Sequence, residues 1–137
     1  MSLDANYRHF SVSGEWCVYH VLIVEDEPKI AAFMQKGLDQ AGYHTDVVGD
    51  GTTALAEATR NNYQLILLDL GLPGLDGQTV LKSLRSQGST CPILIVTARI
   101  PVTPETTILK RLADGWLQKP FKMKELVSRI QQLLPLQ

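Results

Sequence analysis

The sequence predicts an α/β fold, a doubly wound parallel sheet of five strands with helices on both faces. Two observations lead to this prediction. Short runs of apolar, often β-branched residues alternate along the chain with segments whose apolar residues recur at helical spacing. The strand candidates are also apolar at nearly every position, so both faces of the sheet must be covered, which is typical of parallel sheets.

The size and charge of the chain narrow its class. With 137 residues, 45% of them apolar and 20% charged, it has the proportions of one globular domain. Its 13 Lys and Arg residues nearly balance 14 Asp and Glu, so we expect no direct contact with nucleic acid. No apolar run approaches the roughly 20 residues that span a bilayer, and the first residues lack signal-peptide features. We therefore expect no membrane contact and a cytoplasmic location.

The first predicted unit follows an irregular extension. Residues 1–19 show no sustained pattern and precede a domain predicted over 20–135. The domain begins with the apolar strand Val21–Val24, and a helix follows with Pro28 in its first turn, where a missing N–H costs no hydrogen bond. Three apolar residues of this helix are expected in the core: Phe33, Met34 and Leu38.

Four further strand and helix pairs complete the predicted domain. The strands are expected at 45–48, 64–68, 92–96 and 116–118, and the helices at 52–60, 77–86, 105–112 and 122–134. Pro101 and Pro104 restrict where the fourth helix can begin. Because crossovers between parallel strands are right-handed, the simplest arrangement of five strands is flavodoxin-like, with strand order 2-1-3-4-5.

Polar residues follow the predicted strands at the point where each strand ends. Glu25 and Asp26 come after the first strand and Asp69 after the third, while Thr97 ends the fourth and Lys119 follows the fifth. The functional crevice of an open α/β sheet lies beyond the carboxyl ends of its strands. These five side chains are therefore expected to converge.

The chemistry of this set points to phosphoryl transfer. Three carboxylates in one crevice repel one another unless a cation balances them. Mg²⁺ suits such a site because it takes oxygen ligands and combines one or two carboxylates with water and phosphate oxygens. Lys119 is a fitting partner for a phosphate oxygen, Thr97 offers a hydroxyl, and one carboxylate can act as the nucleophile.

Four segments carry a specific combination of motifs in a fixed order. They are Val21–Pro28, Leu67–Gly77, Ile95–Arg99 and Lys119–Phe121. Together they resemble the response-regulator receiver domains of two-component signalling, and the residues after Lys119 look most like the OmpR-like branch. The resemblance implies a phosphoacceptor domain that receives a phosphoryl group from a histidine kinase or histidine phosphotransfer protein and then switches conformation.

The resemblance also implies a role for each residue of the site. Asp69 resembles the phosphoacceptor and also contacts the metal. Asp26 resembles a direct Mg²⁺ ligand, Glu25 an acid that holds the ion through water, and the backbone carbonyl of Gly71 a further ligand.

Three more positions resemble the family's switch. Lys119 would pair with a phosphoryl oxygen and precedes a candidate cis peptide at Pro120. Thr97 resembles the switch hydroxyl, and Trp116 occupies the position of the switch aromatic, although plain packing explains a tryptophan there equally well. The fourth helix, fifth strand and fifth helix would form the readout surface, through which a homodimer can form.

Two other functions stay open. One is a receiver-like adaptor that docks without being phosphorylated. The prolines before the fourth helix favour this alternative, because they alter a region of the expected switch. The other is a phosphatase with an Asp nucleophile, but that chemistry favours a second Asp two residues later, where this chain has Gly71. We expect a phosphoacceptor that assists its own phosphorylation and dephosphorylation, and not a turnover enzyme.

The histidines and cysteines show no ligand pattern. The chain has 3 His and 2 Cys. His9, His20 and His44 are scattered along the sequence without the spacing of metal ligands. Cys17 and Cys91 are expected to be reduced and to serve in packing.

Overall fold

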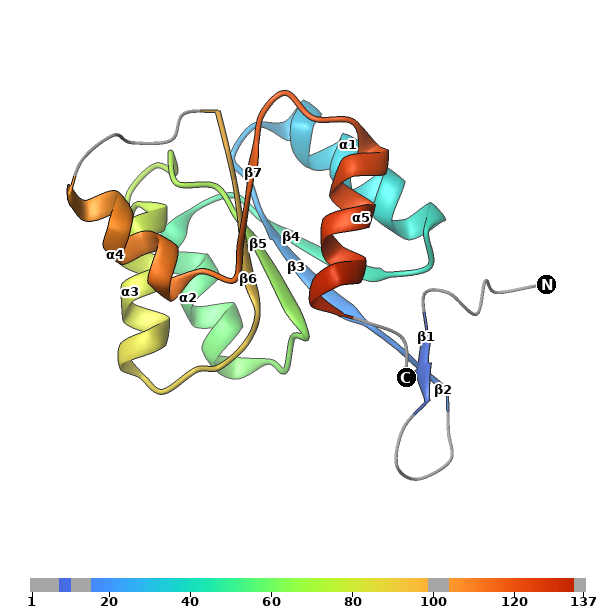
Figure 1. Ribbon diagram of the computed structural model, residues 1–137, viewed down its shortest axis with the longest axis horizontal. Coiled ribbons are helices and arrows are strands. Elements are labelled where there is room, and N and C mark those ends of the chain that lie inside the picture. The colour runs from blue at the N-terminus through green and yellow to red at the C-terminus, as the bar shows by residue number, and fades with distance from the viewer. Residues whose placement is uncertain (1–7, 11–15, 99–103, 135–137) are drawn as a thin grey trace.

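Five parallel strands form the central sheet of the protein (Figure 1). The computed structural model describes residues 8–10, 16–98 and 104–134. The strands are β3 (His20–Val24), β4 (His44–Val48), β5 (Leu65–Leu68), β6 (Ile93–Thr97) and β7 (Gly115–Gln118). They lie in the order β4-β3-β5-β6-β7, which confirms the predicted order 2-1-3-4-5.

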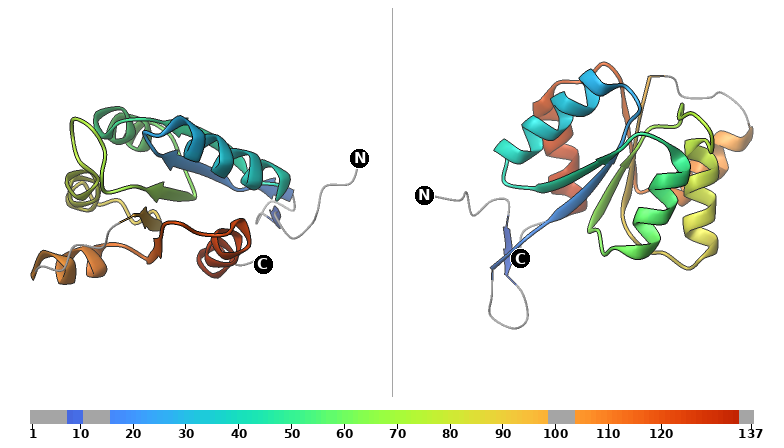
Figure 2. Two further views of the ribbon diagram at one scale, coloured as in Figure 1. Left: turned by 90° about the horizontal axis from the view of Figure 1, so that it is seen from above. Right: turned by 180° about the vertical axis from the view of Figure 1, so that it is seen from behind.

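Five helices cover the two faces of this sheet. They are α1 (Pro28–Gln40), α2 (Gly51–Arg60), α3 (Gly77–Ser86), α4 (Pro104–Leu112) and α5 (Met123–Leu133). Helices α1 and α5 pack on one face and α2, α3 and α4 on the other (Figure 2). The predicted helix at 105–112 is therefore confirmed, and it begins at Pro104 because proline fits the first turn of a helix.

The continuous apolar runs of the strands follow from this two-faced packing. In β3, Val21 and Ile23 belong to the core beneath α1 and α5, whereas Leu22 and Val24 belong to the core beneath α2 and α3. Side chains alternate across a strand, so a strand covered on both faces needs an apolar residue at every position.

Phe33 departs from the prediction that it belongs to the core. Its side chain is 49% exposed, whereas Met34 and Leu38 are buried as expected. The buried stripe of α1 runs through Ala31, Met34 and Leu38, at steps of three and four residues. Phe33 lies one residue away from that stripe, which turns its side chain by about 100° around the helix axis.

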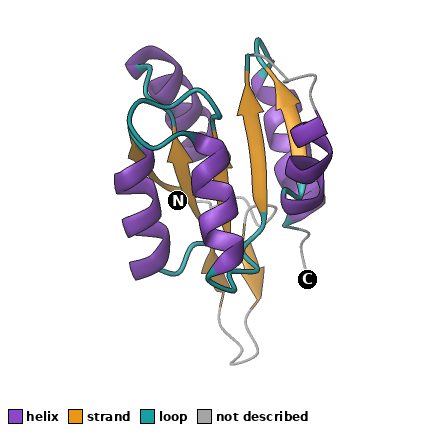
Figure 3. Cartoon of the chain, turned by 90° about the vertical axis from the view of Figure 1, so that its left-hand side faces the viewer, coloured by secondary structure: helices purple, strands orange, loops and turns teal. Residues whose placement is uncertain are grey.

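The segment before the sheet contains a short antiparallel ribbon. β1 (Arg8–Phe10) pairs with β2 (Trp16–Val18) and projects beyond the amino end of β3 (Figure 3). The irregular chain expected over 1–19 is thus replaced here by two strands of three residues each, too short for any periodicity to reveal them. Residues 1–7 and 11–15 of this extension lie outside the described residues, as does Pro101, and the boundary at residue 20 stays a prediction.

None of the described helices combines the length and apolar character required to cross a membrane.

Candidate functional site

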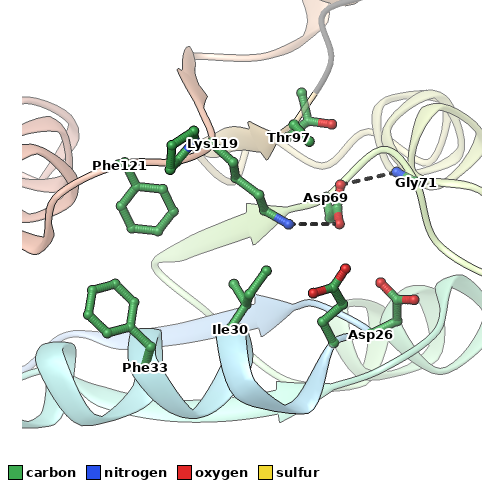
Figure 4. Close-up of a pocket in the computed structure, with 11 residues that line it drawn as sticks. Asp26, Ile30, Phe33, Asp69, Gly71, Thr97, Lys119 and Phe121 are labelled. Atoms are coloured by element: carbon green, nitrogen blue, oxygen red, sulfur yellow. Dashed lines mark hydrogen bonds and ion pairs between the residues drawn. The ribbon is translucent and has the colours of Figure 1, made fainter.

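The carboxyl ends of β3, β5, β6 and β7 surround a cavity of about 630 Å³ (Figure 4). Its lining includes Asp26, Asp69, Thr97 and Lys119, four of the five side chains expected to converge, together with the acidic residue Glu27. The fifth, Glu25, lies beneath the cavity with only 3% of its surface exposed. The expectation that polar residues meet at this edge of the sheet is confirmed.

Asp69 lies at the floor of the cavity, directly after β5. Its carboxylate is held from two sides, because Oδ1 accepts a hydrogen bond from the N–H of Gly71 at 3.1 Å and Oδ2 pairs with Nζ of Lys119 at 3.1 Å. Gly77 allows α3 to begin close behind it, since a Cβ at position 77 would lie 2.2 Å from the carbonyl oxygen of Asp69. Only glycine fits there without moving the backbone.

Lys119 joins the two buried carboxylates. Its N–H donates to the carbonyl oxygen of Thr97 at 2.9 Å, which continues the pairing of β7 with β6, and its ammonium group forms ion pairs with both Glu25 and Asp69. Burial alone would lower the pKa of Lys119, but the hydrogen bonds with Glu25 and Asp69 outweigh that effect and raise it. The side chain therefore carries a fixed positive charge. The peptide bond between Lys119 and Pro120 is cis, as the sequence predicts.

Glu25 and Asp26 are neighbours in very different surroundings. Burial raises the pKa of Glu25, although Lys119 and a hydrogen bond from the N–H of Glu27 oppose that rise. Asp26 is exposed and faces the cavity. One acid is thus part of the buried charge network, while the other is open to a ligand.

The three carboxylates fit a divalent cation. Glu25, Asp26 and Asp69 each place one oxygen so that the three oxygens lie within 4.8 Å of one another. Only the single positive charge of Lys119 balances them among the described residues that line the cavity. Clustered carboxylate oxygens with an incomplete charge balance are the ligands that Mg²⁺ prefers.

Gly71 and Trp116 differ in how they relate to this site. Gly71 lines the cavity, and its carbonyl as a metal ligand stays a prediction. Trp116 lies away from the cavity lining, in β7 beside Ile95 of β6, and packs half-buried against the core beneath α2 and α3. Its indole Nε1 is buried, and no hydrogen-bond partner for it is found in the described part of the chain.

An apolar rim that the sequence analysis missed flanks the acids. Ile30 and Phe33 of α1 face Phe121 across the mouth of the cavity, and the rings of Phe33 and Phe121 lie 6.1 Å apart (Figure 4). The available signal was the spacing of Ile30 and Phe33, which are three residues apart in the first turns after the acids and therefore share a helix face.

A family model for the response regulator receiver domain matches residues 21–131 of the chain. The transcriptional activator protein IrlR of Burkholderia pseudomallei is 47% identical over 114 residues, which are 83% of this chain and 49% of that protein. The chain therefore spans about half the length of the curated relatives it matches.

Solved structures show the same similarity. The receiver domain of a Francisella response regulator superposes with a TM-score of 0.76 at 38% identity, covering 84% of this chain and 95% of the other. The receiver domain of a sensor histidine kinase from Pseudomonas aeruginosa, with a magnesium ion coordinated in its active site cleft, reaches a TM-score of 0.77 at 32% identity. It covers 85% of this chain and 97% of the other.

Proposed function

The chain belongs to the response regulator receiver domains, in their OmpR-like branch, and from that premise we propose that Asp69 accepts a phosphoryl group from a histidine kinase or histidine phosphotransfer protein. The observation that carries the proposal is the position of Asp69 on the cavity floor, 8% exposed and within ion-pair distance of Lys119. A carboxylate in this position can be reached by a phosphoryl donor but is held in one orientation.

The reaction follows from the contacts of Asp69. An oxygen of its carboxylate attacks phosphorus, the bond from phosphorus to the donor nitrogen breaks, and the donor imidazole leaves with the electron pair of that bond. The product is an acyl phosphate on Asp69. The N–H of Gly71 and the ammonium of Lys119 orient the carboxylate before the attack, so positioning and charge neutralisation supply most of the rate enhancement.

Lys119 and Thr97 are suited to hold the product. The transferred group adds negative charge and acceptor oxygens, which Lys119 can take up by exchanging its contact with Asp69 for a phosphoryl oxygen. Thr97 lines the same cavity and offers its hydroxyl as a donor. Side chains that gain a partner only after phosphorylation bias the domain toward its active conformation.

Asp26 and Asp69 would hold Mg²⁺ directly, with the carbonyl of Gly71 as a further ligand and Glu25 contacting the ion through water. When bound, the ion neutralises the charge that develops on the transferred phosphoryl oxygens. The oxygens of the three acids lie close enough together to support this assignment.

The apolar rim is the surface we assign to the phosphoryl donor. Ile30, Phe33 and Phe121 surround the entrance to Asp69, so a protein that delivers a phosphoryl group must pack against them. The exposed ring of Phe33 gives such a partner apolar area to bury.

The output of the switch is a second part of the proposal. Relatives named as transcriptional regulators support a transcriptional output. In this proposal α4, β7 and α5 would form the readout surface, through which a homodimer can form. The domain acts as a phosphoacceptor that assists its own phosphorylation and dephosphorylation, within residues 20–135.

The deciding experiment is the intact mass of the chain after incubation with Mg²⁺ and a small phosphodonor such as acetyl phosphate. We expect one phosphoryl adduct on the wild type and none on Asp69→Asn. Asp76→Asn is the matched control, because Asp76 caps α3 through the N–H of Thr79 at 2.8 Å and asparagine caps equally well. It should be labelled like the wild type.

Two outcomes would contradict the assignment. Labelling of Asp69→Asn at the wild-type rate would place the acceptor elsewhere. A folded wild type that takes up no label, although it binds Mg²⁺, would favour the adaptor function.

A further inference from the structure

A second cluster of ligand-bearing side chains lies toward the amino ends of β3 and β4. These strand ends are at the opposite end of the sheet from the carboxyl ends that surround the cavity (Figure 1 shows the strands). His20 pairs with His44 in the parallel register, and Asp46 follows two residues after His44. Partners across a parallel ladder, and residues two apart on a strand, point to the same face of the sheet. Histidines separated by 24 positions in the sequence thus become neighbours.

The contacts within this cluster are close. The rings of His20 and His44 meet edge to face with their centroids 4.7 Å apart. Nε2 of His20 lies 2.8 Å from Oδ2 of Asp46. One ligand atom from each of the three side chains can be chosen so that all three lie within 4.8 Å of one another.

We propose that His20, His44 and Asp46 bind a divalent transition metal ion of the zinc, nickel and copper class. Two imidazoles and one carboxylate form a donor set that such ions prefer, whereas Mg²⁺ prefers oxygen ligands alone. In tetrahedral Zn²⁺ sites the metal lies about 2.1 Å from each ligand atom, so the three atoms need to move inward by roughly 1 Å. His20 exchanges its contact with Asp46 for the metal, and water completes the coordination.

Tyr63 gives this site an outer partner. Its hydroxyl donates to Oδ2 of Asp46 at 2.8 Å, and its ring packs 4.6 Å from the ring of His20. Both hydrogen bonds described for Asp46 reach Oδ2, so Oδ1 is the oxygen that faces a metal without competition from them. Outer partners that orient a ligating carboxylate are characteristic of metal sites.

The cluster is accessible to an ion from solution. His44 is exposed, the side chains of His20 and Asp46 are 31% and 48% exposed, and β4 is an edge strand of the sheet. A bound metal would join this edge strand to β3 through their side chains. The site shares no residue with the acidic cavity, so the proposal does not depend on the phosphoacceptor function.

The test is a calorimetric titration of Zn²⁺ into the wild-type chain, with excess Mg²⁺ present to occupy the acidic cavity. We expect one Zn²⁺ per chain. Co²⁺ replaces Zn²⁺ in a parallel titration, because the intensity of its visible absorption reports tetrahedral coordination by nitrogen and oxygen. Tyr63→Phe should weaken Zn²⁺ binding by about tenfold, because Tyr63 is an outer partner. His44→Gln removes a ligand, so it should weaken binding by at least about 100-fold, the upper end of the range for outer partners.

A matched variant separates this site from the remaining histidine. His9→Gln removes the histidine outside the cluster and should leave Zn²⁺ affinity unchanged. His44 is exposed, so His44→Gln should keep the unfolding midpoint of the metal-free wild type. Should that variant fail to fold, Asp46→Asn takes its place.

Three results would overturn the proposal. They are a wild type that takes up no Zn²⁺ at millimolar concentration, a His44→Gln variant that binds like the wild type, and a loss in His9→Gln as large as that in His44→Gln.

Discussion

A cluster of charged side chains lies at each end of strand β3, and the charges are stabilised in different ways at the two ends. At the carboxyl end, Glu25 is almost fully buried and depends on Lys119 for an opposite charge. At the amino end, His20 and Asp46 are partly exposed, and Asp46 is hydrogen-bonded to both His20 and the hydroxyl of Tyr63.

Each end of β3 therefore places a different demand on the residues around it. Buried carboxylates cannot be left without a cation, because water no longer screens their repulsion. Exposed imidazole and carboxylate groups are satisfied by hydrogen bonds alone, so a metal there is an addition and not a necessity. Removing a partner should therefore damage the carboxyl end far more than the amino end.

The largest effect is expected from Lys119→Met. This change leaves Glu25 and Asp69 facing each other in a buried site without a cation, so we expect the free energy of unfolding in metal-free buffer to fall by about 3 kcal/mol. Urea denaturation measures it. Adding Mg²⁺ should recover part of the loss, because a ligand that binds only the folded state stabilises it.

Lys124→Met is the matched control, since Lys124 is exposed on α5 and its loss should change stability by less than about 0.5 kcal/mol. Equal stabilities of the two variants would mean that Lys119 does not balance the acids.

The next largest effect concerns Cys91, which lies beside Tyr63 near the amino end of the sheet. Burial raises the pKa of its thiol to about 11, and Sγ donates to the carbonyl oxygen of Tyr63 at 3.3 Å. At pH 8 its thiolate fraction is about 100-fold lower than that of a thiol with the usual pKa, since each pKa unit is a factor of ten. In a Cys17→Ser background, alkylation by iodoacetamide should be slower by that factor than in the urea-unfolded chain.

The raised pKa of the thiol also determines how the alkylation rate changes with pH. The folded chain should react about tenfold faster for each pH unit between 8 and 10, whereas the unfolded chain should level off near pH 9. Equal alkylation rates of the folded and unfolded chains at pH 8 would show that the fold does not raise the pKa of the Cys91 thiol.

A smaller effect is expected from Tyr63→Phe. It removes one hydrogen bond to Asp46, whose side chain is half-exposed, so the loss in unfolding free energy should be about 1 kcal/mol. A double-mutant cycle with Asp46→Asn isolates the pair. A coupling energy of zero would show that Tyr63 does not interact with Asp46.

The smallest effect is expected from Phe33→Ala. The exposed ring of Phe33 should contribute within about 0.5 kcal/mol of stability, and labelling by a small phosphodonor should be unchanged. Met34→Ala is the comparison, because Met34 is 2% exposed and its truncation should reduce stability by about 3 kcal/mol. Similar losses of unfolding free energy in the two variants would mean that Phe33 packs in the core as Met34 does.

The clusters at the two ends of β3 also differ in how well they can be predicted from the sequence. Glu25 and Asp69 each follow an apolar run and Lys119 follows the short fifth strand, so a local pattern and one rule about strand ends suffice to bring them together. The strands of the central sheet and the helices were predicted to within about two residues for the same reason, since each has its own local period, whereas β1 and β2 were not predicted.

The cluster at the amino end depends on information that no single segment holds. His20 meets His44 only because β3 and β4 pair in one register, and a shift by one residue would turn the two side chains to opposite faces. The two histidines are far apart in the sequence, yet they lie side by side in the sheet. Phe33 escaped prediction through a similar ambiguity, since adjacent positions on a helix point in directions that periodicity resolves poorly.

The long sequence separation within the acidic cavity has a consequence for a chain that is still being made. Lys119 pairs with a glutamate 94 positions earlier and an aspartate 50 positions earlier. A nascent chain in which Lys119 is still inside the ribosome holds Glu25 and Asp69 without the cation that pairs with them. For the phosphoacceptor that we propose, the charge-balanced pocket around Asp69 therefore forms only after Lys119 has joined the sheet.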